Sequence, residues 1–322
     1  MYDVTAIGEL LIDFTCQSLD PEGYPTLAAH PGGAPVNFLA AVARAGGKTA
    51  MIGKVGRDTF GTSLIRTLDK LGIATAGVVT GDEAFTTLAF VTLDETGDRS
   101  FSFARKPGAD TQLQPDEVNR DLIAQTRALH FGTLSLTNEP SASAVRQAVR
   151  LAREKGKLIS FDPNLRLPLW DSPEAAKTQM LWGLSQADVV KISDDEAEFL
   201  FGLSPEAGAA RILEEFGVKV VFVTCGAAGC WFQSGAARGR VPGLTGIRMV
   251  DTTGAGDIFG GTALWGILQR GKSPETLDTE ALAVIAQTAC VTASLSTTRP
   301  GGITSVPTPQ ETQKYRATIT TP

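Results

Sequence analysis

Residues 251–257, Asp-Thr-Thr-Gly-Ala-Gly-Asp, have the composition of an anion-binding turn that contains a carboxylate. The segment follows the apolar run 247–250 and precedes a helical pattern. Small residues at a strand-to-helix turn let backbone N–H groups approach an anion, and the helix dipole points the same way. A carboxylate there would repel a phosphate, but it has a use if it takes a proton from a hydroxyl that attacks the phosphate. We therefore predict that Asp257 is a general base beside an anion hole. The predicted anion hole consists of Gly254, Ala255 and Gly256.

Two other interpretations of this segment stay open. A helix start capped by Thr253 explains an acid in the first turn, but it does not explain Gly-Ala-Gly, which initiates helices poorly. A dinucleotide-binding loop would use the glycines at 254, 256 and 260, but their spacing is GxGxxxG, and Asp257 would stand against the pyrophosphate. A nicotinamide-dependent oxidoreductase is therefore the weaker interpretation. The apparent end of a P-loop at 47–49 fails, because valine occupies position 42 where a glycine is required.

The turn at 251–257 resembles the C-terminal signature of the ribokinase-like (PfkB) carbohydrate kinases. Residues 32–37 (Gly-Gly-Ala-Pro-Val-Asn) and 53–61 look like the other signature of that family. Two further stretches, 161–166 and 223–229, follow in the expected order. Four ordered motifs are far more specific than one, and the resemblance extends over nearly the whole chain. It implies a phosphotransferase that uses ATP and Mg²⁺ to phosphorylate a sugar hydroxyl.

Polar residues near the predicted turns supply the expected sugar contacts. Glycines before the helix at 36–45 let a ligand lie against the backbone, and Asn37 offers a donor and an acceptor to a pair of hydroxyls. Taken singly, these residues would more often be caps, turn residues or solvated charges, and the family resemblance is what raises them to sugar ligands. The expected substrate-binding residues are Asp13, Gly33, Asn37, Arg105, Asp162 and Arg166.

The resemblance also implies where ATP and its metal ions bind. The family commonly has an N-x-x-E motif, whereas this chain has Ser193 in the asparagine position and keeps Glu196, which would act on Mg²⁺ through water. The helix at 282–294 would form one wall of an adenine slot, although close helix packing explains its small residues equally well. The expected ATP contacts are Lys191, Ser193, Thr224, Gly226, Gly229 and Ala289. By analogy, a K⁺ loop near the anion hole would join Asp251, Thr253, Gly301 and Ser305.

Four stretches look most like fructokinases: 89–93, 101–105, 129–136 and 161–170, the last most strongly. We therefore expect fructose as the acceptor, through a primary hydroxyl. Ribokinases, 2-keto-3-deoxygluconate kinases and nucleoside kinases share the scaffold and stay open, as does a non-catalytic sugar or nucleotide sensor. Hydroxyl placement separates these substrates, and it is recognised through side-chain directions that a sequence does not give.

Strand-like and helix-like segments alternate along most of the chain, which favours an α/β fold with a doubly wound, mostly parallel sheet flanked by helices. The expected helices are 36–45, 60–71, 141–154, 172–186, 205–216 and 282–294, with strands at 129–134, 158–161, 189–192 and 218–223. Segments 11–31 and 86–105, the latter around a turn at 94–98, break this pattern and predict a small β-sheet lid. An ordinary surface hairpin is the alternative. We expect one domain over 1–322, with the lid segments inserted in it.

Composition limits the class of protein. The chain has 322 residues and a net charge of −6 without a basic run, which argues against a nucleic-acid binder. The four cysteines form no CxxC pair, the first residues lack a basic leader, and no apolar stretch reaches the roughly 20 residues of a membrane span. We expect a cytoplasmic protein without membrane or nucleic-acid partners, able to form a homodimer through its lid. With two histidines and no HExxH or GxSxG motif, metallohydrolases and serine hydrolases gain little support.

Overall fold

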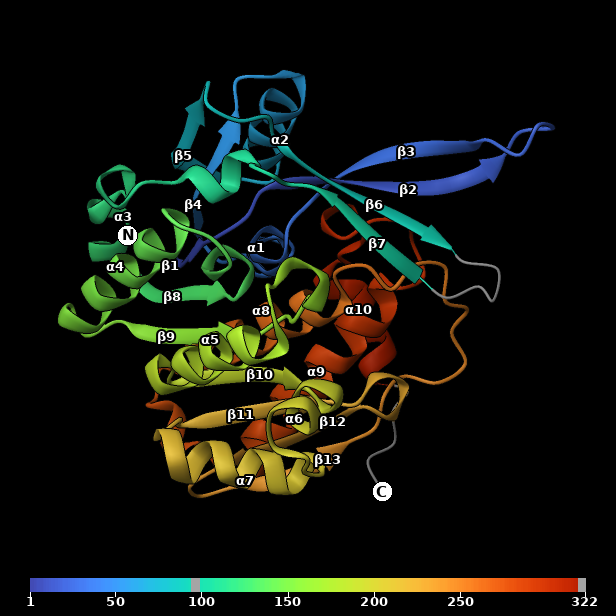
Figure 1. Ribbon diagram of the computed structural model, residues 1–322. Helices are drawn as coiled ribbons and strands as arrows, with labels where there is room; N and C mark the ends of the chain where they lie inside the picture. Colours follow the sequence, from blue (N-terminus) through green and yellow to red (C-terminus); the bar gives the residue numbers. More distant parts are fainter. Residues whose placement is uncertain (94–98, 318–322) are drawn as a thin grey trace.

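The computed structural model describes residues 1–93 and 99–317, so the predicted turn at 94–98 lies outside the described residues. The main body is a nine-stranded sheet with helices on both faces (Figure 1). Its strands lie in the order β13 (Arg238–Val241), β12 (Cys230–Ser234), β11 (Val220–Thr224), β10 (Val189–Ser193), β9 (Leu158–Asp162), β8 (Thr126–Gly132), β1 (Tyr2–Ile7), β4 (Thr49–Gly56) and β5 (Ile73–Gly81). Neighbours from β11 to β5 are parallel, and β12 and β13 add an antiparallel edge. This is the predicted doubly wound, mostly parallel sheet.

Both faces of this sheet are buried, because successive side chains of a strand point to opposite sides. In β11, Val220 and Phe222 belong to one apolar core, whereas Val221 and Val223 belong to the other. The first core is covered by α1 (Ala34–Arg44), α2 (Thr59–Lys70), α8 (Ala255–Gln269) and α9 (Thr279–Ser296). The second is covered by α3 (Arg120–Ala124), α4 (Ser141–Glu154), α5 (Pro173–Gln186), α6 (Asp194–Phe201) and α7 (Pro205–Phe216). The last helix, α10 (Pro309–Arg316), packs against α9.

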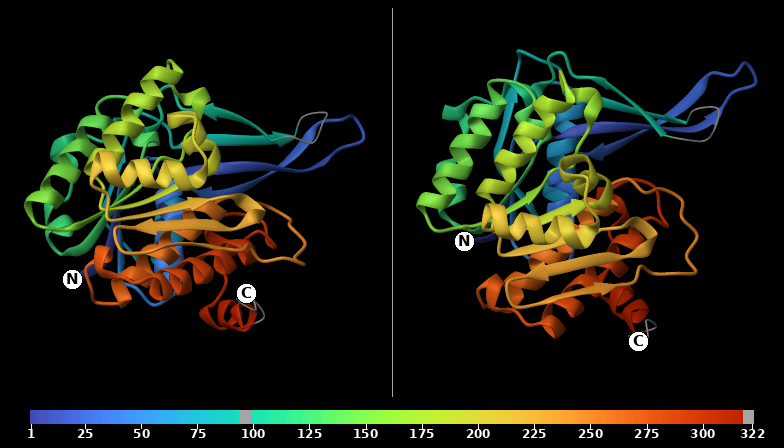
Figure 2. Two further views of the ribbon diagram at one scale, coloured as in Figure 1. Left: turned by 90° about the horizontal axis from the view of Figure 1, so that it is seen from below. Right: turned by 60° about the horizontal axis from the view of Figure 1, so that its bottom comes forward.

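A second, four-stranded sheet projects from the body on the side to which the arrowheads of the parallel strands point (Figures 1 and 2). Its order is β3 (Pro25–Gly32), β2 (Leu11–Leu19), β6 (Thr87–Leu93) and β7 (Arg99–Ala104). The central pair β2–β6 is parallel, and the two outer pairs are antiparallel. The two segments that broke the βα pattern therefore form one small sheet, as predicted, rather than a separate surface hairpin.

Several predicted elements have the observed bounds, but one predicted strand is wrong. The helices expected at 141–154 and 205–216 coincide with α4 and α7. The apolar run 247–250, expected as the strand before the anion hole, is irregular, and Met249 is 63% exposed. The reason is local, since the N–H groups of Val250 and Asp251 donate to the carbonyl of Thr297 instead of to a neighbouring strand. Within the described residues, no helix is both long enough and apolar enough to span a membrane.

Candidate active site

A cavity of about 260 Å³ lies where the small sheet faces the carboxyl ends of the main strands. The small sheet contributes Leu11, Asp13, Ala89 and Phe103, and the start of α1 contributes Gly33, Ala34 and Asn37. The start of α8 and the loops after the main strands complete the wall with Glu9, Leu134, Asn164, Arg166, Thr252, Thr253, Gly254 and Asp257. The cavity therefore joins residues that are more than 200 positions apart in the chain, from both sheets and two helix starts.

Asp257 lies in the first turn of α8 and is 9% exposed. The side-chain amide of Asn37 donates a hydrogen bond of 2.9 Å to its Oδ2. Burial raises the pKa of Asp257 to about 6, although the hydrogen bond from Asn37 and the positive charge of Lys191 act in the opposite direction. A buried carboxyl with a pKa near the working pH suits general-base chemistry.

The predicted anion hole lies directly beside this carboxylate. Gly254, with φ of 75°, precedes the first turn of α8, where backbone N–H groups have no intrahelical acceptor. A Cβ atom on Gly254 would lie 2.8 Å from the Asn37 amide nitrogen, and one on Gly256 would lie 3.0 Å from the Lys191 ammonium. Glycine at 254 and 256 thus leaves room for the Asn37 amide and for the Lys191 ammonium at the amino end of α8.

Lys191, in the middle of β10, and Asp162, at the end of β9, form a buried ion pair. The Lys191 Nζ atom lies 3.1 Å from Asp162 Oδ2 and 3.2 Å from Oδ1. Burial alone would lower the pKa of Lys191, but the surrounding carboxylates of Asp162, Glu196 and Asp257 raise it, so the ammonium stays charged. Asp162 does not line the cavity, although it was predicted to bind substrate directly. It holds Lys191 in place instead.

Asp13 and Arg166 both line the cavity. Burial raises the pKa of Asp13 to about 7, and the positive charge of Arg166 acts against this shift. A Cβ atom on Gly32 would lie 2.1 Å from Asp13 Oδ2, so the first glycine of the Gly-Gly pair makes room for this carboxylate. Asn164, which also lines the cavity, has a φ of 46°, a left-handed conformation that directs the loop carrying Arg166.

Arg105 lies behind the wall of the cavity. It follows β7, is 6% exposed and is absent from the cavity wall. Its Nε and Nη2 atoms donate to Asp110 Oδ2 at 2.9 and 2.7 Å, and Nη1 donates to Thr137. Nη2 also donates to the carbonyl of Leu134, which does line the cavity. Arg105 therefore supports the wall through Leu134, and its direct contact with the sugar stays a prediction.

Ser193 and Glu196 form a capping box at the start of α6. The Ser193 hydroxyl accepts from the N–H of Glu196, and Glu196 Oε2 accepts from the N–H of Ser193 at 2.8 Å. Glu196 Oε1 accepts from the N–H of Leu165 at 2.7 Å, which ties the loop after β9 to α6. Among the described residues, no group of three or more His, Cys, Asp or Glu side chains is arranged to hold a metal ion. The N–H groups of Ser193 and Leu165 therefore occupy both carboxylate oxygens of Glu196.

The predicted nucleotide residues follow β11 on the same side of the sheet. Thr224 ends this strand beside Ser193 of β10. Gly226 and Gly229 have φ values of 51° and 97°, and a Cβ atom on Gly229 would lie 2.1 Å from the carbonyl oxygen of Val241. Ala289 is different, because it is completely buried inside the core that α9 shares with the sheet. Close packing, the alternative that the sequence left open, is what the structure has at Ala289.

The two segments of the predicted cation loop do meet. Asp251 Oδ2 accepts from the N–H of Gly301 at 2.9 Å, and Oδ1 accepts from the N–H and hydroxyl of Thr253 at 2.9 and 2.7 Å. Ser305 is fully buried and its hydroxyl donates to the carbonyl of Gly302. One carboxylate therefore fixes the loop after α9 against the turn that precedes α8.

A sequence model described as pfkB family carbohydrate kinase matches residues 1–309. The chain belongs to this family. Probable fructokinase-5 of Arabidopsis thaliana is 41% identical over 320 residues, 97% of this chain and 96% of that protein. A fructokinase from Xylella fastidiosa, solved with bound ATP, has a TM-score of 0.90 at 31% identity and covers 99% of both chains. A double mutant of Vibrio cholerae O395 fructokinase, solved with fructose, ADP and potassium, has a TM-score of 0.86 at 31% identity and covers 98% of both. The predicted kinase family and fold are confirmed.

Glu9 is a charged cavity residue of this kinase that sequence reasoning missed. It is 2% exposed, lines the cavity and accepts from the N–H of Ala34 at 2.9 Å. Burial raises its pKa to about 7. It follows β1 at the carboxyl edge of the sheet, and the rule that pointed to residues after β9 would have found it too.

The family signature at 53–61 serves the small sheet rather than the cavity. Asp58 caps α2 by accepting from the N–H of Gly61 at 2.8 Å. The same carboxylate accepts from the N–H and hydroxyl of Thr86 at 2.8 and 2.9 Å, directly before β6. This signature therefore anchors the base of the small sheet to the main body.

Proposed function

We propose that this kinase transfers the γ-phosphoryl group of ATP to a primary hydroxyl of fructose. The observation that carries the proposal is that a buried base, Asp257, lines the cavity in the first turn of α8, where the Lys191 ammonium lies close to Gly256. Such a site suits phosphoryl transfer, in which positioning and charge stabilisation supply most of the catalysis. The fructokinase names of the curated relatives and solved structures support fructose as the acceptor.

In this reaction Asp257 accepts the proton of the attacking hydroxyl. The hydroxyl oxygen forms a bond to the γ-phosphorus while the bond to the oxygen that bridges to ADP breaks, and ADP leaves. The N–H groups at the start of α8 and the Lys191 ammonium stabilise the charge on the transferring group. Asp162 acts through Lys191 by holding its ammonium group beside Gly256.

The sugar would bind between Asp13 and Asn37. Asn37 lines the cavity, and its buried Oδ1 is an acceptor that no described residue uses. The carboxyl of Asp13 supplies further acceptors on the small sheet, and Gly33 leaves the backbone open to the ring. Arg166 would lie between the sugar and the phosphates. We expect the small sheet to act as a lid that excludes water during transfer.

ATP would lie along the carboxyl edge, against Thr224, Gly226 and Gly229. Mg²⁺, when bound, neutralises phosphate charge, and it would be held chiefly by the phosphates and water, since Glu196 already accepts two backbone hydrogen bonds. The joined segments around Asp251 are the place for K⁺, as the potassium-bound relative suggests.

Two further expectations concern the setting of the enzyme. Leu19 and Tyr24, at the far end of the small sheet, are 66% and 71% exposed, so a second copy of the chain would cover apolar surface there. All four cysteines are free thiols, which suits a reducing cytoplasm. Sedimentation analysis of the wild type against Leu19→Ser tests the dimer, because a monomeric wild type would rule it out.

The direct test is release of ADP from Mg-ATP with D-fructose, D-ribose, 2-keto-3-deoxygluconate or a nucleoside, each with and without K⁺. We expect turnover with fructose and stimulation by K⁺. Preference for another acceptor would keep the phosphotransfer chemistry and reject fructose. Folded, ATP-binding protein that releases no ADP with any acceptor would reject the kinase proposal in favour of a sensor.

A further inference from the structure

The start of α1 forms part of the cavity wall, but the helix does not cap itself. Gly33 precedes its first turn and has no side chain to accept a hydrogen bond, and that turn contains no acidic residue. The N–H groups of Val36 and Asn37 donate to the carbonyl of Gly33, and Pro35 has no N–H group. The N–H group of Ala34 therefore needs an acceptor from outside the helix.

Glu9 supplies that acceptor from the turn after β1. Its Oε1 atom accepts from the N–H of Ala34 at 2.9 Å, across 25 positions of the chain. The carboxylate also brings negative charge to the amino end of α1, where the helix dipole favours it. Glu9 is 2% exposed, so little water competes for this bond.

Two glycines bring the turn after β1 into direct contact with the start of α1. A Cβ atom on Gly33 would lie 2.5 Å from the carbonyl oxygen of Glu9, and one on Gly8 would lie 2.6 Å from Cγ of Pro35. Glu9 therefore meets the start of α1 through its backbone as well as through its carboxylate. The place of α1 relative to β1 is set at this contact.

The position of α1 in turn decides where Asn37 meets the proposed base. Asn37 donates to Asp257 Oδ2 at 2.9 Å. Its amide group is closely surrounded, since a Cβ atom on Gly302 would lie 2.3 Å from Oδ1 and one on Gly254 would lie 2.8 Å from Nδ2. A shift of α1 would therefore move the amide away from Asp257 or press it against these backbones. Misplacement of a reacting group by about 1 Å can cost about 10²-fold in rate.

Glu9 also interacts with the base of the small sheet. Arg105, directly after β7, lies 2.7 Å from Asp110 in a buried ion pair, and Thr87 of β6 donates to the same carboxylate. Burial raises the pKa of Glu9 to about 7, and the charge of Asp110 adds to this shift, whereas the charge of Arg105 opposes it. One carboxyl group is thus coupled to both elements between which the sugar is proposed to bind.

We propose that Glu9 is a positioning residue of the sugar site, whose carboxylate fixes the start of α1 and thereby the place at which Gly33 and Asn37 hold the sugar beside Asp257. The inference rests on the proposed phosphoryl transfer at Asp257. The strands β8, β9 and β10 lie between β1 and β11, which is followed by the expected ATP contacts. Glu9 should therefore affect the sugar and the base, and leave ATP binding nearly unchanged.

The test compares two variants of Glu9 that differ in one property. Glu9→Met keeps the length of the side chain and loses the acceptor, whereas Glu9→Gln keeps an acceptor for the N–H of Ala34. ADP release measures kcat and the KM values for D-fructose and for ATP, and denaturant titration measures the stability of each protein. Isothermal titration calorimetry with fructose, in the presence of a non-hydrolysable ATP analogue, measures sugar binding without turnover.

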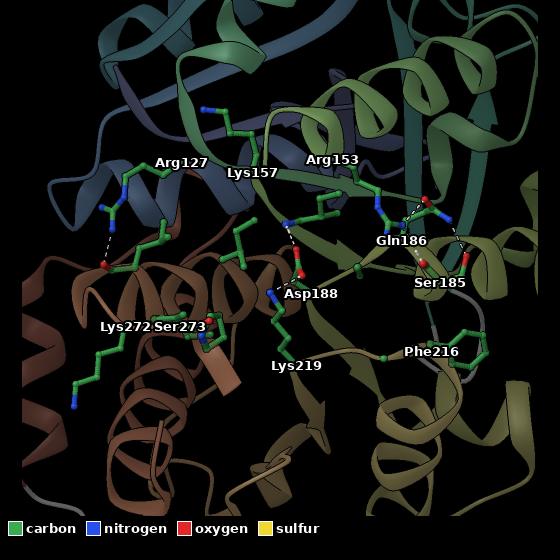
Figure 3. A pocket seen from close by; sticks show the side chains of 18 of the residues that line it. Arg127, Arg153, Lys157, Ser185, Gln186, Asp188, Phe216, Lys219, Lys272 and Ser273 are labelled. Carbon is green, nitrogen blue, oxygen red and sulfur yellow. Dashed lines mark hydrogen bonds and ion pairs between the residues drawn. The ribbon is translucent and has the colours of Figure 1, made fainter. Parts of the chain in front are cut away.

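The matched control is Asp188→Leu at the opposite, amino edge of the main sheet. Asp188 lines a second cavity, of about 570 Å³, where it pairs with Lys219 at 3.1 Å (Figure 3). Like Glu9, it accepts from one backbone N–H group, that of Ile159, at 2.8 Å. This variant therefore loses a carboxylate–backbone bond of the same kind without contact with the sugar cavity.

We expect Glu9→Met to raise the KM for fructose and to lower kcat, each by about tenfold or more, with the KM for ATP within about twofold of the wild type. Glu9→Gln should recover most of both losses, and Asp188→Leu should lose stability while it keeps all three kinetic constants. Unchanged fructose constants in Glu9→Met would overturn the proposal. Equal losses in Glu9→Gln and Glu9→Met would also overturn it, as would a rise in the KM for ATP as large as that for fructose.

The calorimetry separates this inference from the proposed function. If the wild type binds fructose without releasing ADP, the phosphotransfer proposal fails. Weaker fructose binding by Glu9→Met than by Glu9→Gln would then still support the positioning role, and equal binding would reject it. A folded wild type that neither binds nor phosphorylates fructose would overturn both.

Discussion

The two edges of the main sheet differ in the sign of the groups that they gather. At the carboxyl edge, helices begin, backbone N–H groups are free, and buried carboxyls such as Asp13 and Asp257 have raised pKa values. At the amino edge, helices end, and the wall of a second cavity carries five exposed or half-buried cations and one carboxylate, Asp188. The direction of the helices thus gives the carboxyl edge backbone N–H groups that suit an anion, and gives the amino edge helix carbonyl ends that favour cations.

The largest effect should come from removing the base at the carboxyl edge. We expect Asp257→Asn to lower kcat by about 10²–10⁴-fold while leaving ATP binding nearly unchanged, because only the proton acceptor is lost. Steady-state ADP release and nucleotide titration measure the two quantities. Asp195→Asn, an exposed carboxyl in the first turn of α6, is the matched control and should keep its activity. Near-normal turnover in Asp257→Asn would reject the mechanism.

The positive charge of Lys191 offsets the negative charge of the buried carboxylates at this edge. Lys191→Met would leave Asp162 buried without its partner, and removing one member of a buried pair costs about 3–5 kcal/mol. We expect a loss of that size in the free energy of unfolding, measured by denaturant titration, together with a loss of activity. The double variant Lys191→Met/Asp162→Asn should regain much of the stability but none of the activity. Recovery of both would show that Lys191 is only structural.

The sequence could predict the chemistry of the carboxyl edge because short motifs carry it. The Gly-Ala-Gly turn and Asp257 are contiguous, and the structure brings Asn37 to them across 220 positions. Partners that lie outside the motifs could not be predicted. The pairing of Arg105 with Asp110 was not predicted, because Asp110 belongs to none of the motifs although it lies only five residues away. The exposed run 247–250 was read as a strand because its backbone partner, Thr297, is distant in the chain.

Stability and activity should respond to pH in opposite directions. Burial raises the pKa of Asp13 and of Glu9 to about 7, above their usual values in an unfolded chain. A raised carboxyl pKa stabilises the fold below the unfolded value, and this contribution is lost as the pH rises through about 7. We expect each residue to lower the free energy of unfolding by about 2 kcal/mol between pH 5 and pH 8. Over the same range kcat/KM should rise through about pH 6, where Asp257 ionises.

Asp13→Asn and Glu9→Gln check this pH dependence separately. Each amide cannot titrate, so each variant should show a smaller difference in unfolding free energy between pH 5 and pH 8 than the wild type. Denaturant titration at both pH values measures this difference. A wild type that becomes more stable from pH 5 to pH 8, with no change in either variant, would show that these carboxyls are ionised in the folded protein.

The smallest expected effect comes from comparing two helix N-caps, one of which also anchors the small sheet. Asp58 and Asp278 are both N-caps, of α2 and α9, but only Asp58 also accepts from Thr86 at the base of the small sheet. Loss of a cap costs about 1 kcal/mol, so Asp278→Ala should lose that amount of stability and keep its KM for the sugar. Asp58→Ala should lose somewhat more, and its KM for the sugar should rise several-fold, because the sheet that carries Asp13 is held less firmly over the cavity. Equal KM values in the two variants, measured by ADP release, would mean that the position of the small sheet does not depend on this anchor and that the packing of Phe14 against Phe60 of α2 is sufficient to hold it.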